Sequence, residues 1–238
     1  MARAMTVEQL GQAVAQALGP RLVAFLLYGS AARGGTAHVP GRSDLNTLLI
    51  CDAADDTLFA ALASVVARWR KAGQPAPLIL TEREWRESAD AFPIEYDDIR
   101  HAHRLLAGRD PWGGITVRRE DLRRQLEHEL KGKVIRLRQA CAALREDPKA
   151  LAAALAGSVA GFFTMLRSTL RLAGRTAPAA PDELVREAGA VVGFPAESVR
   201  DVVAHAQGRV KMKLVAGDPR AAAYVWAVTR TAEFVNQL

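Results

Sequence analysis

Cysteines and long apolar runs are both scarce in this chain of 238 residues. The two cysteines, Cys51 and Cys141, are too few for a disulfide framework and lie in apolar surroundings, which favours a reducing, cytoplasmic setting. We find no apolar stretch of the roughly 20 residues that span a bilayer. Residues 1–19 also lack the long apolar core of a secretory signal. We therefore expect a cytoplasmic protein without a membrane-spanning segment.

Internal repeats and low-complexity tracts are absent as well, which excludes solenoid and disordered classes. Hydrophobic residues make up 50% and charged residues 24% of the chain, as in a soluble globular protein of one or two domains. The charge is uneven: residues 1–116 carry net −1 and residues 117–238 carry net +7. The basic half could attract a triphosphate or a nucleic acid, although a solvated basic helical surface explains it equally well.

The first half of the chain alternates between helical and strand patterns. Thr81 and Glu84 have the spacing of a capping box at the start of a short helix. These patterns predict a small mixed sheet flanked by helices, so we assign residues 1–116 to an α/β (α+β) domain. The predicted helices cover residues 6–18, 57–72 and 82–88, and the predicted strands cover 21–28, 45–51, 77–81 and 93–99.

The second half, residues 117–238, carries apolar residues every three or four positions, which predicts a helical bundle. Asp147-Pro148 and Asp218-Pro219 are typical helix starts, and Gly174 is a typical helix end. The predicted helices begin near 117 and 148, cover 182–191 and 196–206, and end with 219–236. Their apolar stripes suit internal packing or a homodimer.

Polar residues gather where two of the predicted strands end and begin. Gly29-Ser30 follows the first strand, and Ser43-Asp44-Leu45-Asn46 opens the second. Glycine lets the backbone approach a phosphate closely, and Ser30 and backbone N–H groups can donate to its oxygens. Arg33 could contact the same anion in a bidentate way. His38, in the connecting loop, could also touch a nucleotide, but its position is unspecific.

This layout resembles the signature of the nucleotidyltransferase superfamily, typified by DNA polymerase β and the aminoglycoside nucleotidyltransferases. The match consists of residues 27–34, LYGSAARG, and residues 43–46, SDLN. Residues 92–108, FPIEYDDIRHAHRLLAG, also resemble stand-alone bacterial nucleotidyltransferase-like proteins with a helical C-terminal domain. The resemblance implies transfer of a nucleoside monophosphate from a metal-bound nucleoside triphosphate to a hydroxyl of a small molecule or protein. It also implies Mg²⁺ as cofactor and a role for residues 117–238 as an acceptor-binding or interaction domain.

Site residues follow from the resemblance position by position. Asp44 matches the first metal-binding carboxylate, and residue 46, on the same strand face, matches the second. Asn46 stands there without a charge, so it would hold a hard cation more weakly. Glu95 is the first candidate for the third carboxylate, on another strand, with Asp97 and Asp98 as alternatives. The resemblance thus implies a metal site of Asp44, Asn46 and Glu95, catalytic roles for Asp44 and Glu95, and triphosphate contacts from Gly29, Ser30, Arg33 and Ser43.

Two other functions compete with this interpretation. Because residue 46 is an asparagine, the same fold could be a catalytically degenerate nucleotide-binding or interaction protein. Arg200 and His205 have the R-x4-H spacing of HEPN-type ribonucleases, and a basic bundle could bind RNA, so a nucleic acid is the less favoured partner. His101 and His103 could form a metal pair, although surface or hydrogen-bonded histidines are more common.

Overall fold

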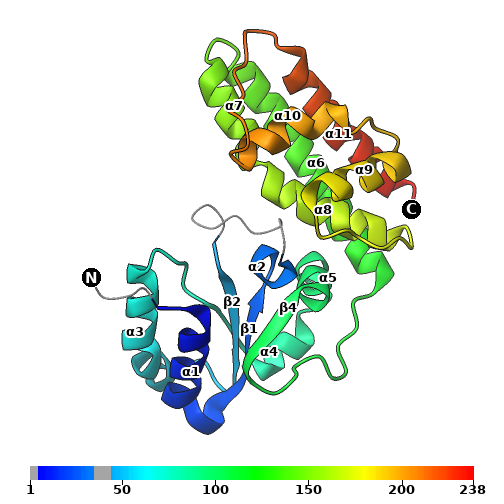
Figure 1. The fold of residues 1–238 in the computed structure, drawn as a ribbon. Coiled ribbons are helices and arrows are strands. Elements are labelled where there is room, and N and C mark those ends of the chain that lie inside the picture. Colours follow the sequence, from blue (N-terminus) through cyan, green and yellow to red (C-terminus); the bar gives the residue numbers. More distant parts are fainter. Residues whose placement is uncertain (1–4, 35–43) are drawn as a thin grey trace. The chain divides into compact units, whose positions relative to one another are not determined.

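The chain forms two compact units in a computed structural model that describes residues 5–34 and 44–238. The first unit is Met1–Val117 and the second is Arg118–Leu238. The first contains a small sheet with helices, and the second contains helices (Figure 1). This arrangement confirms the predicted fold class, a small mixed sheet of the α+β type followed by a helical domain.

Four strands form the sheet of the first unit in the order β3-β2-β1-β4. The central strand β1 (Leu22–Tyr28) pairs antiparallel with β2 (Asn46–Cys51) on one side and with β4 (His103–Gly108) on the other. Strand β3 (Leu78–Thr81) pairs parallel with β2. The sheet is therefore mixed, and the registers of β2 and β4 are both defined by pairing with β1.

Helices cover both faces of this sheet (Figure 1). One face lies against α1 (Val7–Leu18) and α3 (Asp56–Lys71), and the other against α4 (Glu82–Glu87) and α5 (Pro93–His101). Side chains alternate across a strand, so each strand contributes to both cores. Phe25, Leu27 and Leu49 join the α1/α3 core, whereas Leu26, Leu48, Ile50, Trp85 and Tyr96 belong to the α4/α5 core.

The strand predicted over residues 93–99 is wrong, because this segment forms helix α5. Pro93 occupies the start of the helix, an acidic residue lies in its first turn, and Arg100 and His101 lie in its last turn. Each of these features favours a helix. The fourth strand is instead β4, which follows directly and ends at Gly108, whose φ of 86° few residues other than glycine adopt.

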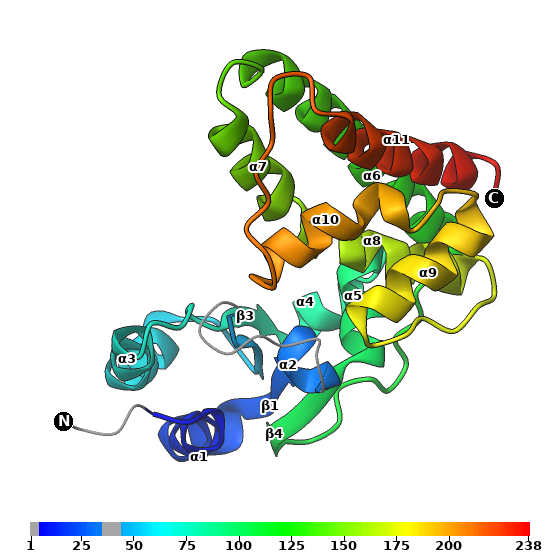
Figure 2. The same ribbon diagram turned by 45° about the horizontal axis from the view of Figure 1, so that its top comes forward.

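The second unit is a bundle of helices. Helices α6 (Arg119–Ala143) and α11 (Pro219–Asn236) run alongside each other (Figure 2). The remaining helices are α7 (Pro148–Gly157), α8 (Val159–Leu172), α9 (Pro181–Val192) and α10 (Glu197–Ala206). Their starts and ends agree with the predicted bundle, except that the helix predicted from residue 148 is two helices.

The break between α7 and α8 lies at Ser158 and is held by side-chain hydrogen bonds. The Ser158 hydroxyl donates to the carbonyl oxygen of Leu155 and accepts from the hydroxyl of Tyr224, both at 2.7 Å. The Ser158 carbonyl oxygen accepts a hydrogen bond of 3.0 Å from Nζ of Lys133. Burial lowers the pKa of this lysine. Partners on α6 and α11 therefore fix this junction.

One apolar stretch is longer than expected from the sequence. Among the described residues, Pro148–Leu172 is long and apolar enough to cross a membrane by length and composition, with a mean hydropathy of 1.5. The expectation that no such stretch exists is therefore wrong. Core helices of soluble proteins have the same property, and Leu155, Phe162 and Leu166 of this stretch are buried within the unit.

The predicted capping box at the start of α4 is confirmed. The Thr81 hydroxyl accepts from the Glu84 N–H at 3.1 Å, and the Glu84 carboxylate accepts from the Thr81 N–H at 2.7 Å. These bonds satisfy two backbone donors that the helix itself leaves unpaired, and they lower the pKa of Glu84.

Replacing Thr81 by valine keeps the side-chain shape and removes the capping oxygen. We expect Thr81→Val to lower the free energy of unfolding by about 1 kcal/mol, as measured by urea denaturation. Thr116→Val, at an exposed loop position, is the matched control and should change stability little. Equal effects of the two substitutions would contradict a capping role.

Candidate functional site

The turn after β1 depends on Gly29. This residue has φ 77° and ψ −146°, a region that essentially only glycine occupies. Its N–H donates to the carbonyl oxygen of Ala102 at 3.0 Å, and its own carbonyl oxygen accepts from the N–H groups of Ala32 and Arg33, each at 3.2 Å. The chain thereby turns from β1 directly into the short helix α2 (Ser30–Arg33). Ser30 is half-buried at the start of this turn.

Asn46, the first residue of β2, lies beside this turn, and Asp44 precedes it by two residues. Asn46 is paired with Tyr28 in the sheet, and its Nδ2 lies 3.3 Å from the position that a Cβ at residue 29 would occupy. Asp44 is exposed and lies just outside the strand. The N–H of Leu45 donates to Oε1 of Gln74 at 2.9 Å, which anchors the segment between them.

Glu95 lies on helix α5, not on a strand as predicted, and its side chain is exposed. The effect of Glu95 on the pKa of Tyr28, the last residue of β1, shows that Glu95 lies near the turn. Burial raises the pKa of Tyr28, and the negative charges of Glu95 and Asp98 raise it further. The face of the sheet that carries Tyr28 and its partner Asn46 is the face that α5 covers. Helix α5 therefore brings carboxylates to the same face as Asn46.

Arg33 forms an ion pair with Asp98, across 65 positions of sequence. The two side chains are only 8% and 11% exposed. This guanidinium is thus directed to α5, although the sequence suggested a contact with a bound phosphate. Asp98, an alternative third carboxylate, is the partner of this arginine. The pair connects α2 to α5 and so fixes the turn after β1 against the helix that carries Glu95.

Both histidines after the acidic segment have structural partners. His101 Nδ1 donates to the carbonyl oxygen of Asp97 at 2.7 Å, and the Asp97 carboxylate lies 3.4 Å away. His103 Nδ1 donates to the carbonyl oxygen of Ile99 at 2.9 Å, while its Nε2 accepts from the indole N–H of Trp112 at 3.2 Å. With both ring nitrogens of His103 occupied, the structure does not favour a metal-binding pair here.

The donor set for a metal is small. Strands β1, β3 and β4 carry no Asp or Glu, so no strand next to β2 supplies a third carboxylate. Within residues 5–34 and 44–238 no three His, Cys, Asp or Glu side chains cluster as metal ligands. The predicted set consists of two carboxylates, Asp44 and Glu95, and the amide oxygen of Asn46. Mg²⁺ commonly binds through one or two carboxylates plus substrate phosphates, so the chemistry of this set suits one ion carried by a triphosphate.

Two residues named from the sequence, Ser43 and His38, lie outside the described residues. The basic residues near the start of the helical unit are largely occupied within it. Arg119 donates to the carbonyl oxygen of Leu172. The other contacts are Arg118 with Asp121, Arg123 and Lys131 with Glu127, and Lys133 with the Ser158 carbonyl.

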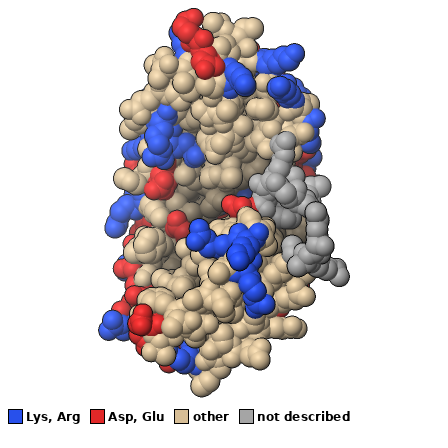
Figure 3. All heavy atoms as spheres, turned by 90° about the vertical axis from the view of Figure 1, so that its left-hand side faces the viewer, with Lys and Arg blue, Asp and Glu red and all other residues tan. Residues whose placement is uncertain are grey.

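The structure adds little support for an RNA-binding or RNA-cleaving function. His205 lies in α10 and its Nδ1 donates to the carbonyl oxygen of Val210 at 3.3 Å. On the face drawn in Figure 3, Lys and Arg side chains lie in separate groups with acidic side chains among them. This face lacks a continuous basic stripe of the kind that would neutralise successive phosphates of a nucleic acid.

Comparison with known proteins shows the fold. No family model and no curated protein sequence matches the chain. Among solved structures, the chain is similar to spectinomycin adenyltransferase AAD(9) from Enterococcus faecialis, whose crystal structure contains ATP and spectinomycin. The TM-score is 0.53 at 11% identity, over 92% of this chain and 95% of that one. The likeness therefore extends over both units and supports a nucleotidyltransferase-like fold.

The conformation of Gly29 generates a first prediction for this site. Alanine there would be strained at φ 77° and would press on the amide of Asn46. We expect Gly29→Ala to lower the free energy of unfolding by about 1–3 kcal/mol, as measured by urea denaturation. Gly113→Ala is the control, because a Cβ at that position meets no described atom within 4 Å. A Gly29→Ala variant as stable as Gly113→Ala would show that the turn is not strained.

The ion pair between Arg33 and Asp98 generates a second prediction. Asp98→Asn keeps the side-chain shape but leaves the buried guanidinium without its counter-charge, so we expect a loss of about 3 kcal/mol in chemical denaturation. Glu8→Gln removes one member of the exposed pair with Arg104 and should have little effect, because solvent screens that pair. If the two variants are equally stable, the Arg33–Asp98 pair does not hold α2 to α5.

Proposed function

We propose that the chain binds a nucleoside triphosphate at the end of β1 and transfers its nucleoside monophosphate to a hydroxyl of a small molecule or protein. One observation carries the proposal. The Gly29 turn and the start of β2 meet at the sheet face that helix α5 covers, and α5 carries the carboxylates of Glu95 and Asp98. The helical unit is proposed as the acceptor-binding or interaction domain. The ATP and spectinomycin in the AAD(9) structure support a triphosphate and a small-molecule acceptor.

The residues at this end of the sheet have distinct proposed roles. Gly29 gives the turn its left-handed backbone conformation, and the Ser30 hydroxyl that follows it can donate to a phosphate oxygen. Arg33 positions the turn through Asp98. Asp44, Asn46 and Glu95 are the oxygen donors for Mg²⁺. When bound, this ion would neutralise charge on the triphosphate and on the leaving pyrophosphate.

Glu95 is the proposed proton acceptor for the acceptor hydroxyl. Its carboxylate is exposed on α5 and can take the hydroxyl proton, since carboxylates commonly act as general bases. The hydroxyl oxygen then forms a bond to the α-phosphorus, and the bond from that phosphorus to the bridging oxygen of pyrophosphate breaks. The products are the nucleotidylated acceptor, pyrophosphate, and a proton held on Glu95.

A second candidate function is nucleotide binding without turnover. It is favoured by a specific observation: residue 46 is an amide, and no strand beside β2 carries a carboxylate. A site with this donor set binds a metal–triphosphate complex more weakly than one with three carboxylates. Such a protein would act as a nucleotide-dependent interaction protein on the same fold.

The proposed binding is tested by titrating the four Mg²⁺–nucleoside triphosphates into the whole chain by isothermal titration calorimetry. We expect at least one to bind, and Asp44→Ala to weaken it tenfold or more, because the variant removes the one carboxylate at the start of β2. Asp90→Ala, an exposed acid in the same unit, is the control and should bind as the wild type does. Equal affinity of the wild type and Asp44→Ala would contradict this site.

The two candidate functions are separated by Asn46→Asp, which restores a carboxylate next to Gly29. Pyrophosphate release is measured with Mg²⁺–ATP and a panel of polyhydroxylated acceptors. Turnover by the wild type, lost in Glu95→Gln, supports the transferase. No turnover by the wild type together with a gain in Asn46→Asp supports nucleotide binding alone.

A further inference from the structure

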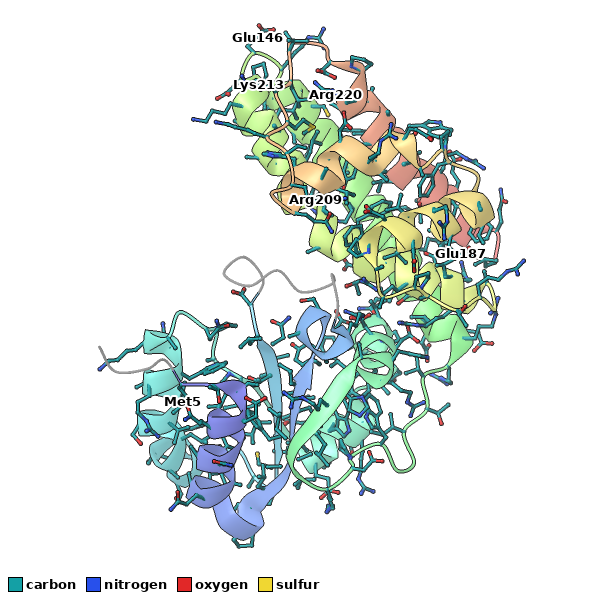
Figure 4. The ribbon with its side chains drawn as sticks, in the orientation of Figure 1. Met5, Glu146, Glu187, Arg209, Lys213 and Arg220 are labelled. Atoms are coloured by element: carbon teal, nitrogen blue, oxygen red, sulfur yellow. The ribbon has the colours of Figure 1, made fainter. Side chains whose placement is uncertain are left out.

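The helical unit contains a pocket that the proposed nucleotide site does not use. Its volume is about 770 Å³, and it lies at the end of α8 between α9 and the last turn of α11. Figure 4 labels Glu187, which lies on α9. Ten residues line this pocket: Arg119, Leu172, Ala173, Gly174, Arg175, Glu187, Ala190, Val191, Phe234 and Leu238.

The pocket contains charges of both signs that are not paired with each other. Arg175 and Glu187 make no ion pair within 4.0 Å and no side-chain hydrogen bond with residues 5–34 or 44–238. Their charged atoms therefore lie more than 4.0 Å apart. A ligand that carries both a negative and a positive group can bridge them, whereas a ligand with one charge leaves one of the two side chains unmatched.

Arg119 adds a second guanidinium that is fixed in place. It donates one hydrogen bond to the carbonyl oxygen of Leu172, one of the last carbonyl groups of α8, which have no partner within the helix. A guanidinium has five N–H donors, so others remain for a ligand carboxylate. The two arginines thus favour a carboxylate, because planar guanidinium groups match its two oxygens. The single Glu187 favours an ammonium group.

Apolar residues complete the lining. Ala190 and Val191 of α9 and Phe234 of α11 contribute apolar surface, and Val191 and Phe234 are only half-buried. Pockets for small molecules combine such apolar surface with a few polar groups, and volumes of about 300–1,000 Å³ are typical. The pocket is therefore large enough for an amino acid with a large apolar side chain and its first hydration waters.

We propose that this pocket binds a free α-amino acid with a large apolar side chain. Arg119 and Arg175 hold the carboxylate, Glu187 holds the ammonium group, and the side chain lies on Val191 and Phe234. The proposal is independent of the nucleotide site, since every lining residue belongs to the helical unit. This end of the bundle is thus proposed as an amino-acid-binding site.

Calorimetry with the whole chain tests the proposal through three related ligands. L-Phenylalanine has both charges, 3-phenylpropionate lacks the ammonium group, and phenethylamine lacks the carboxylate. We expect L-phenylalanine to bind at least tenfold more tightly than either analogue. No binding of L-phenylalanine at millimolar concentration, or equal binding of 3-phenylpropionate, would overturn the proposal.

Two variants assign the charges. Glu187→Gln should weaken L-phenylalanine tenfold or more and leave 3-phenylpropionate unchanged, because only the former has an ammonium group. Arg175→Gln should weaken both of these carboxylates. Arg186→Gln, an exposed arginine on α9 outside the pocket lining, is the matched control and should bind as the wild type does. Unchanged circular dichroism shows that a variant is folded, and a folded Glu187→Gln that binds L-phenylalanine normally would refute the assignment.

Discussion

The pairing of β1 with both β2 and β4 is the constraint from which the geometry of the first unit follows. It places Tyr28 opposite Asn46 on one side and opposite His103 on the other, as one row across the sheet. Residues opposite each other in antiparallel strands share a face. This row therefore decides that Asn46 lies on the face covered by α5, and it places the Gly29 turn at the same end of the sheet.

Two long-range contacts then hold the elements around this row. The ion pair of Arg33 with Asp98 joins the turn after β1 to α5. The hydrogen bond from Gly29 to Ala102 joins the same turn to the segment between α5 and β4. In both contacts, groups near the candidate site hold elements of the fold together. Asp98, an alternative for the third carboxylate, is thereby engaged by Arg33.

Much of the fold could be predicted from local patterns. Helix periodicity, the Thr81 capping box and the Asp-Pro helix starts all agree with the structure, and both cysteines are free thiols, Cys51 buried in β2 and Cys141 half-buried in α6. Residues 93–99 resemble a strand because their apolar and acidic residues alternate, although the same residues also match a helix. The break at Ser158 cannot be predicted from local sequence because it depends on Lys133 and Tyr224, which are distant in sequence.

Local sequence patterns are enough to predict the fold class and the Gly29-Ser30 turn, because periodicity and turn chemistry depend on neighbouring residues. Which side chains meet depends on the tertiary structure. It directed Arg33 to Asp98, moved Glu95 from a strand to a helix, and brought Arg119, Arg175 and Glu187 into one pocket. These outcomes depend on strand register and helix packing over long sequence separations, which no local pattern specifies.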